Sequence, residues 1–285
     1  MSTRPRVHLV SYATPGFRLR QLVLGWSARL NHVADTVTSW TSAALRAAGF
    51  EDRVKDIRLT ERGSGYWAWK PFVIDAKLRE VPDGDLVFYC DIGRLYPFKM
   101  LDQPVDSFVR WMDERSQDMM PGVEIPWTGT NSMWTKREAL VATGMDRAEV
   151  HCASPVQASF SLWRAGARSR DFVACWLDWC SQRPLVSDDP SRGGLAELPD
   201  FQGHRHDQSL LTLCCLARGV SALSLGTTTP QIDGRHPSEV SRLCFGETPA
   251  GQTRAGRLLR AAVRHVARIE HGLRRLGKST TPFRR

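Results

Sequence analysis

The chain has 285 residues, of which 42% are hydrophobic and 24% are charged, and its formal net charge is +9. These values are typical of a globular protein with one large domain or two small ones and a sizeable core. No stretch approaches the roughly 18 uninterrupted apolar residues of a membrane span, and Pro15 and Gly16 break the first apolar run, so we expect neither a span nor a signal peptide but a cytoplasmic protein.

Strands and helices alternate over the first hundred residues. Residues 6–13 and 34–40 predict strands, and the three- and four-residue spacing of apolar side chains over 17–33 predicts a helix between them. Residues 41–49 predict a second helix, capped by Thr41 or Ser42. A third helix follows Pro71 and ends before the turn at 82–85. This alternation predicts an α/β fold with a mixed, mostly parallel sheet flanked by helices.

The apolar run Leu86–Cys90 predicts a buried strand that leads straight into Asp91, with Gly93 two residues later. Carboxylates are rarely buried without a partner, and ligands of such sheets gather at the carboxyl ends of the strands. Asp91 is therefore predicted to face a ligand.

The segment RGSGYWAWKPF, residues 62–72, combines two glycines, three aromatic residues and a lysine. Trp67 and Trp69 are candidates for stacking on a ring or a sugar, with core packing beside the helix as the alternative. Lys70 precedes Pro71 at a helix start, a position that favours anions, and is a candidate phosphate contact.

The later half of the chain predicts more helix than strand. Lys136 and Arg137, at the start of a predicted helix, are either a second phosphate contact or a solvated helix end. Gln157 begins an extended run at 156–164, and residues 220–226 also look extended. Helices are predicted at 107–114, 136–144, 170–183 and 207–219.

The segment FQGHRHDQS, residues 201–209, gathers polar side chains before an apolar helix: His204, Arg205, His206, Asp207 and Gln208. An isolated Asp at this position is most often a helix cap, but its polar neighbours favour a pocket wall. His236 lies in a loop bounded by Gly and Pro, where a lone histidine is more often a surface residue than a metal ligand.

Seven cysteines without a C-x-x-C pair do not indicate a zinc site or a disulfide framework. Most of them lie in apolar runs and are predicted to be buried thiols: Cys90, Cys175, Cys180, Cys214 and Cys215.

Five segments, in this order, resemble bacterial transferases found with capsule, lipopolysaccharide and exopolysaccharide genes: RGSGYWAWKPF, DGDLVFYCDIG, WTKRE, QASFSLW and HRHDQS. The resemblance covers about residues 6–245 and is to GT-A nucleotide-sugar glycosyltransferases. It implies a GT-A-like (Rossmann-like) domain over 1–250, with a nucleotide-sugar half at about 1–130 and an acceptor half at 131–250. The activity implied is transfer of a hexosyl or pentosyl group from a nucleotide sugar to a saccharide or lipid-linked acceptor in surface polysaccharide synthesis.

In the GT-A fold that the resemblance implies, an Asp-x-Asp pair holds Mg²⁺ or Mn²⁺ against the donor diphosphate. Here Gly93 replaces the second Asp, so Asp91 either binds the metal with diphosphate and water or contacts the donor ribose or sugar directly. His236 stands roughly where such enzymes place a late metal-binding histidine. An inverting enzyme needs a carboxylate base, for which Asp207 is the candidate. The resemblance implies donor binding by Tyr12, Trp67, Trp69, Lys70, Asp91, Gly93, Lys136 and Arg137, and acceptor contacts by Gln157, His206 and Gln208.

The net positive charge is confined to residues 251–285, which hold ten Lys or Arg and one acid, whereas residues 1–250 are neutral. Apolar residues recur there at helical spacing, which predicts a basic amphipathic helix on an anionic membrane surface, peripheral to the inner face of the plasma membrane. The alternative is a helix that docks its apolar stripe on the body.

Two other classes of function compete with a transferase. The isoelectric point of about 9.5 and ten tryptophans are compatible with nucleic-acid binding through the tail, but the body is neutral and no nucleic acid is expected as a partner. A carbohydrate-binding or hydrolytic protein would use the tryptophans, and a hydrolase would need two carboxylates across the glycosidic bond.

Overall fold

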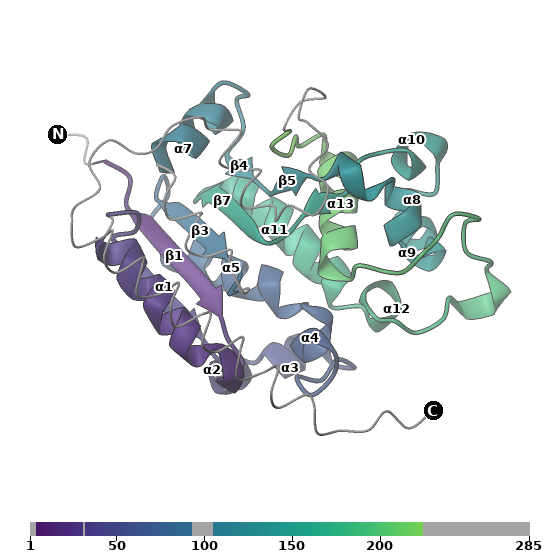
Figure 1. The fold of residues 1–285 in the computed structure, drawn as a ribbon, viewed down its shortest axis with the longest axis horizontal. Coiled ribbons are helices and arrows are strands. Elements are labelled where there is room, and N and C mark those ends of the chain that lie inside the picture. The colour runs from purple at the N-terminus through teal and green to yellow at the C-terminus, as the bar shows by residue number, and fades with distance from the viewer. Residues whose placement is uncertain (1–3, 31, 93–104, 225–285) are drawn as a thin grey trace.

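The computed structural model describes residues 4–30, 32–92 and 105–224 (Figure 1). Gly93, His236 and the predicted tail helix at 251–285 lie outside these ranges. The first half contains β1 (Val7–Tyr12), α1 (Arg18–Leu30), β2 (Thr36–Trp40), α2 (Ser42–Ala47), α3 (Phe50–Val54), α4 (Gly63–Tyr66), α5 (Trp69–Glu80), β3 (Leu86–Cys90) and α7 (Val105–Asp113). The described residues after α7 contain β4 (Met119–Met120), β5 (Val123–Glu124), α8 (Asn131–Trp134), α9 (Arg137–Ala142), α10 (Ala148–His151), β6 (Val156–Gln157), β7 (Phe160–Arg164), α11 (Ala167–Cys180), α12 (Arg183–Val186) and α13 (Asp207–Arg218).

A mixed five-stranded sheet in the order β2-β1-β3-β7-β4 forms the centre of the fold, which confirms the predicted α/β class. Strand β1 pairs in parallel with β2 and β3, whereas β7 pairs antiparallel with both β3 and β4. Parallel and antiparallel pairings are therefore equal in number in this sheet, so it is mixed, as predicted, but not mostly parallel, because β7 runs antiparallel to both of its neighbours. Strand β7 lies after residue 131 and the other four strands lie before it, so both predicted halves share one sheet.

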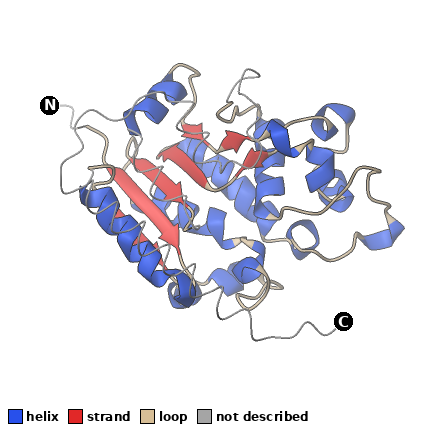
Figure 2. Ribbon diagram, in the orientation of Figure 1, coloured by secondary structure: helices blue, strands red, loops and turns tan. Residues whose placement is uncertain are grey.

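Helices cover both faces of the sheet (Figure 2). Alternate residues of β3 enter different cores: Leu86, Phe88 and Cys90 pack with residues of α1 and α7. Val87 and Tyr89 pack on the other face with residues of α5 and α11. Because side chains alternate along a strand, a residue two positions after Tyr89 points towards α5.

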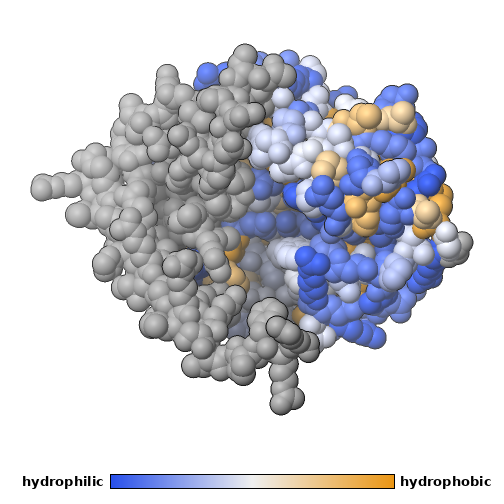
Figure 3. Space-filling model, turned by 45° about the vertical axis from the view of Figure 1, so that its right-hand side comes forward, coloured by the Kyte–Doolittle hydropathy of each residue, from blue (hydrophilic) through white to orange (hydrophobic). Residues whose placement is uncertain are grey.

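The short helices α8, α9, α10 and α12 surround α13 on the right of Figure 1, and α13 packs on α11. The buried hydrophobic residues of α9, α10, α12 and α13 belong to the same core as those of α5 and α11. Hydrophilic residues cover most of the coloured surface on this side, and hydrophobic ones form small groups (Figure 3). This arrangement holds the start of α13 beside the sheet.

Most long helices lie close to their predicted positions. Thr41 caps α2 by accepting a hydrogen bond from the Ala44 amide at 3.1 Å. The run at 156–164 is not one strand but two, because β6 pairs with β5 and β7 joins the central sheet. In the predicted strand at 220–226, the described residues form one isolated bridge, between Leu223 and Val123. No helix within the described ranges has the length and apolar character to cross a membrane.

Candidate functional site

Asp91 follows the last residue of β3 and points to the α5 side of the sheet. The Tyr89 hydroxyl donates a hydrogen bond to Asp91 Oδ1, and the Asp91 amide donates to the Ser159 carbonyl at 2.8 Å. The Asp91 side chain is 28% exposed and lines two cavities. The strand thus delivers a fixed carboxylate to open space, as its sequence predicts.

Lys70, in the first turn of α5, is buried between the carboxylates of Asp91 and Asp207. Its Nζ donates a hydrogen bond to the Ala158 carbonyl at 2.9 Å and lies 3.4 Å from Asp91 Oδ2 and 3.1 Å from Asp207 Oδ2. Burial alone lowers the pKa of Lys70, but the two carboxylates outweigh it and raise the pKa above its ordinary value. The ammonium therefore stays charged and joins β3, α5 and α13.

Asp207 is the first residue of α13, and His206, not Asp207, occupies the N-cap position. The Asp207 side chain is almost fully buried. Burial, together with the charge of Asp91, raises the pKa of Asp207 to about 6, against the opposing charge of Lys70. Asp207 is thus an ion-pair partner of Lys70 at the cavity wall, and the capping alternative does not describe it.

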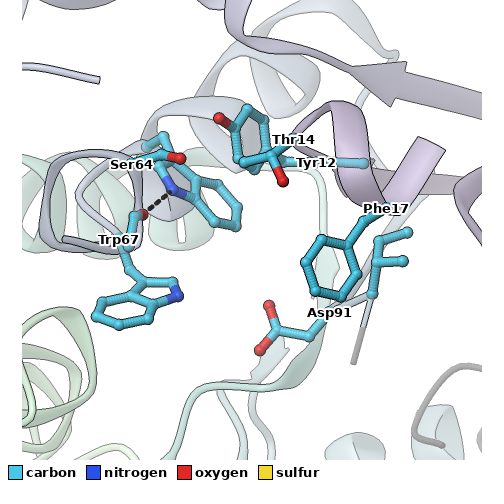
Figure 4. Close-up of a pocket in the computed structure, with 10 residues that line it drawn as sticks. Tyr12, Thr14, Phe17, Ser64, Trp67 and Asp91 are labelled. Carbon is cyan, nitrogen blue, oxygen red and sulfur yellow. Dashed lines mark hydrogen bonds between the residues drawn. The ribbon is translucent and has the colours of Figure 1, made fainter. Parts of the chain in front are cut away.

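An aromatic cavity of about 400 Å³ opens on one side of Asp91 (Figure 4). Phe17, Trp67 and Asp91 face its open space. The Tyr12 and Trp69 rings also line it and pack on each other, with centroids 4.1 Å apart and planes tilted by 35°. Tyr12 itself is only 5% exposed. The cavity is lined by Tyr12, Ala13, Thr14, Phe17, Gly63, Ser64, Trp67, Trp69, Asp91 and Ile92.

The turn at Gly63 to Trp67 brings the two tryptophans to this cavity. All five residues have positive φ, which is costly for side chains other than glycine. A Cβ at Gly63 would lie 2.4 Å from the Trp67 ring, so the ring can occupy its position only because residue 63 is glycine. Trp69 Nε1 donates a hydrogen bond to the Gly63 carbonyl at 2.9 Å and closes the turn.

A second, polar cavity of about 310 Å³ opens on the other side of Asp91. Trp67 and Asp91 line both cavities, so the two meet at these side chains. Ser159 Oγ is buried at this wall without a hydrogen-bond partner. The polar cavity is lined by Arg62, Trp67, Lys70, Asp91, Gln157, Ala158, Ser159, His204, Arg205, His206, Asp207 and Gln208.

Two buried histidines shape the wall of the polar cavity. The His206 ring stacks on Trp67 with centroids 5.3 Å apart, and its Nδ1 donates to the Val186 carbonyl at 2.9 Å. His204 Nε2 donates to the Leu185 carbonyl at 2.8 Å, and its Nδ1 accepts from the Lys136 amide. Burial lowers the pKa of both histidines, so both rings are neutral at neutral pH.

The predicted contacts Lys136 and Arg137 do not reach the two cavities at Asp91. Lys136 is buried, its Nζ donates to the Asp189 carbonyl at 3.2 Å, and it lines a separate cavity of about 380 Å³. Arg137 forms an ion pair with Asp146 at 3.2 Å. Local carbonyl and carboxylate groups satisfy both cations, so neither is free to meet a ligand bound at Asp91.

Several residues of the site were not among the predicted site residues: Tyr89, which donates to Asp91, and the lining residues Thr14, Phe17, Ser64, Ser159, Arg62 and Arg205. The period of two along β3 could have identified Tyr89 as a neighbour of Asp91. Arg62 and Arg205 belong to segments that the sequence already singles out. Phe17 follows the turn after β1, and nothing in its local pattern points to the cavity.

The described residues provide a poor divalent-cation site around Asp91. Asp91 Oδ1 accepts a hydrogen bond from Tyr89, and Asp91 Oδ2 lies 3.4 Å from the Lys70 ammonium. A divalent cation bound there would be repelled by the charge of Lys70. Within the described ranges, no three His, Cys, Asp or Glu side chains converge as metal ligands. Gly93 and His236 lie outside those ranges, so the predicted Mg²⁺ or Mn²⁺ ion stays a prediction.

The arrangement can hold a ring in an aromatic cavity and a hydroxylated or anionic group beside it, with the Asp91 side chain at the junction. Comparison of the chain with protein-family models, with curated protein sequences and with solved structures finds no match, so the functional proposal depends on this geometry and on the sequence motifs.

Proposed function

We propose that the protein is a glycosyltransferase with a GT-A-like fold, which transfers a sugar from a nucleotide-sugar donor to a saccharide or lipid-linked saccharide acceptor. The observation that carries the proposal is the position of Asp91 at the meeting point of the aromatic and polar cavities. Aromatic walls suit a nucleobase, whose flat face stacks on rings. Amide, hydroxyl and carboxylate groups suit the hydroxyls of a sugar, so the two cavities match the two parts of a nucleotide sugar.

The proposed position of the nucleotide sugar assigns a role to the residues that line the two cavities. The nucleoside lies in the aromatic cavity against Phe17 and Trp67, with Tyr12 and Trp69 packed behind. Asp91 contacts the ribose or the donor sugar at the junction. Gln157, His206 and Gln208 line the polar cavity, where the saccharide lies.

Asp207 is the proposed general base. In a direct displacement, the acceptor oxygen forms a bond to the anomeric carbon, the bond from that carbon to the diphosphate oxygen breaks, and Asp207 takes the hydroxyl proton. A base acts best when its pKa lies near the working pH, and the pKa of Asp207 is about 6. Lys70 holds both Asp207 and Asp91 in place and is a positioning residue.

Surface polysaccharide synthesis, a lipid-linked acceptor and attachment to an anionic membrane through 251–285 remain predictions from the sequence. They complete the proposal because a peripheral enzyme meets a lipid-linked acceptor at the membrane surface.

Nucleotide binding provides the first test. The melting temperature is measured with nucleoside diphosphates of different bases, with Mn²⁺ and with EDTA. Ligand at 100 times its Kd stabilises the fold by about 2.7 kcal/mol, which corresponds to a rise of about 5 °C for a chain of this size. We expect this shift in the native chain and its loss in Asp91→Asn.

Asp178→Asn is the matched control, because Asp178 is 61% exposed and its ion pair with Arg53 lies on the surface. This variant should keep the full shift. Absence of a shift with every nucleotide, with or without Mn²⁺, would refute the proposed function. Cleavage of a glycan without any nucleotide would favour a hydrolase.

A further inference from the structure

The guanidinium of Arg205 is a half-buried cation without a carboxylate partner among the described residues. Its Cζ lies 3.8 Å from the centroid of the Trp134 ring. Its backbone amide is fixed by Trp134 O and Ser209 Oγ, both at 3.1 Å. Burial lowers the pKa of Arg205 and no neighbouring charge opposes this effect, yet arginine remains protonated at any physiological pH. A fixed, desolvated cation of this kind favours an anion beside it.

The other cations of the polar cavity are already paired. Lys70 lies between Asp91 and Asp207, and Arg62 donates to Asp188 at 2.9 Å. Arg205 lines the same cavity and has no such pair among the described residues. Among the described residues that line this cavity, Arg205 is therefore the cation available for a ligand.

Gln208 adds a second donor at the same wall. Its Nε2 is buried and has no hydrogen-bond partner. A buried amide N–H without a partner is costly, so a ligand acceptor at this position would be favoured. Two residues of one segment thus present unused donors to one cavity.

We propose that Arg205 binds the diphosphate of the nucleotide-sugar donor, with Gln208 as a further donor to its oxygens, an inference that rests on the proposed function. A nucleoside in the aromatic cavity meets the polar cavity at Trp67 and Asp91, so its phosphates lead towards Arg205. The planar guanidinium fork matches two phosphoryl oxygens. When the bond from the anomeric carbon to the diphosphate oxygen breaks, the diphosphate keeps the electron pair, and Arg205 stabilises the charge that develops.

The test measures binding of inorganic pyrophosphate, in EDTA and at low ionic strength, by calorimetry. We expect Arg205→Gln to weaken binding about 10- to 100-fold, as for a lost hydrogen bond to a charged group. Arg205→Lys should lose part of the affinity, because it keeps the charge without the fork. Arg168→Gln should leave pyrophosphate binding unchanged, since Arg168 is 74% exposed and its contact with Asp118, at 3.9 Å, is long. Melting temperatures without ligand establish that each variant is folded.

A second arm identifies the source of the anion and separates the two proposals. A nucleoside should bind Arg205→Gln and the native chain equally, whereas the nucleoside diphosphate should lose affinity in the variant. If pyrophosphate binds both chains equally, the inference is wrong even where nucleotides bind. If the variant loses pyrophosphate but keeps the nucleoside diphosphate, the anion belongs to the acceptor and the donor assignment is overturned. If no nucleotide binds the native chain but pyrophosphate depends on Arg205, the anion site stands and the proposed function fails.

Discussion

Replacing Lys70 with methionine should destabilise the fold in a way that depends on pH. The substitution leaves the buried carboxylate of Asp207 without its cation, and breaking a buried pair from one side costs about 3–5 kcal/mol. Lys70 is the main influence that lowers the pKa of Asp207, which is nevertheless about 6. Without Lys70 this pKa rises further.

The sign of the effect follows from proton binding. The folded variant keeps a proton on Asp207 at pH values where the unfolded chain, with an ordinary pKa of 3.8, has released it. Stability therefore falls as pH rises towards the folded pKa. In the native chain this fall ends near pH 6. Each unit by which the loss of Lys70 raises the pKa of Asp207 above its native value adds about 1.4 kcal/mol to the loss of stability at higher pH.

Urea unfolding of both chains at pH 5 and pH 8 measures this difference. Lys77→Met is the matched control, since Lys77 is also buried in α5 but donates to Glu80, whose side chain is 65% exposed. Its removal leaves no buried charge, so its cost should be the same at both pH values. An equal cost of Lys70→Met at pH 5 and pH 8 would show that Lys70 does not hold an ionised Asp207.

Three further predictions concern ligand binding, catalysis and the tail. Trp67→Ala should weaken nucleotide binding by about 1–3 kcal/mol in calorimetry, because it removes a ring on which the base stacks. Trp127→Ala should leave binding unchanged, because Trp127 is exposed and lies outside both cavities. Sugar transfer should rise between pH 5 and 7 with an apparent pKa near 6 and be lost in Asp207→Asn; a rate that is flat over this range argues against Asp207 as the base. Deleting 251–285 should release the protein from anionic vesicles in a sedimentation assay, because each base near the surface contributes about 1 kcal/mol; unchanged sedimentation contradicts the membrane assignment.

Local sequence signals predict the part of the fold that local physics determines. The apolar run of β3 and its period of two place Asp91 at a strand end on the side of Tyr89. The long helix α1 follows from apolar spacing, which burial of one helix face requires, and α5 follows from Pro71 and the turn at 82–85. The boundaries of α1, α5, α11 and α13 lie within a few residues of the prediction.

Non-local contacts determine the part that the sequence did not predict. The insertion of β7 between β3 and β4 depends on pairing partners far away in the chain. The ion pair of Lys70 with Asp207 requires that α5 and α13 both pack on α11. A non-local contact also holds Lys136 away from Asp91. Its Nζ donates to the carbonyl oxygen of Asp189, a residue that no local pattern connects to it.

The imbalance of charge around Lys70 connects donor binding to the proposed base. One ammonium lies between two carboxylates, and an anion bound at Arg205 would bring further negative charge into the same cavity. Nearby negative charge raises the pKa of a carboxyl group, so donor binding should make Asp207 a stronger base before the acceptor arrives. Pyrophosphate should therefore bind the native chain more tightly at pH 5.5 than at pH 7.5. This change in affinity should be larger than the change measured for Asp207→Asn. The comparison of the two chains cancels the effect of the titration of pyrophosphate itself. The same pH dependence in both chains would mean that the charge at Arg205 does not reach Asp207.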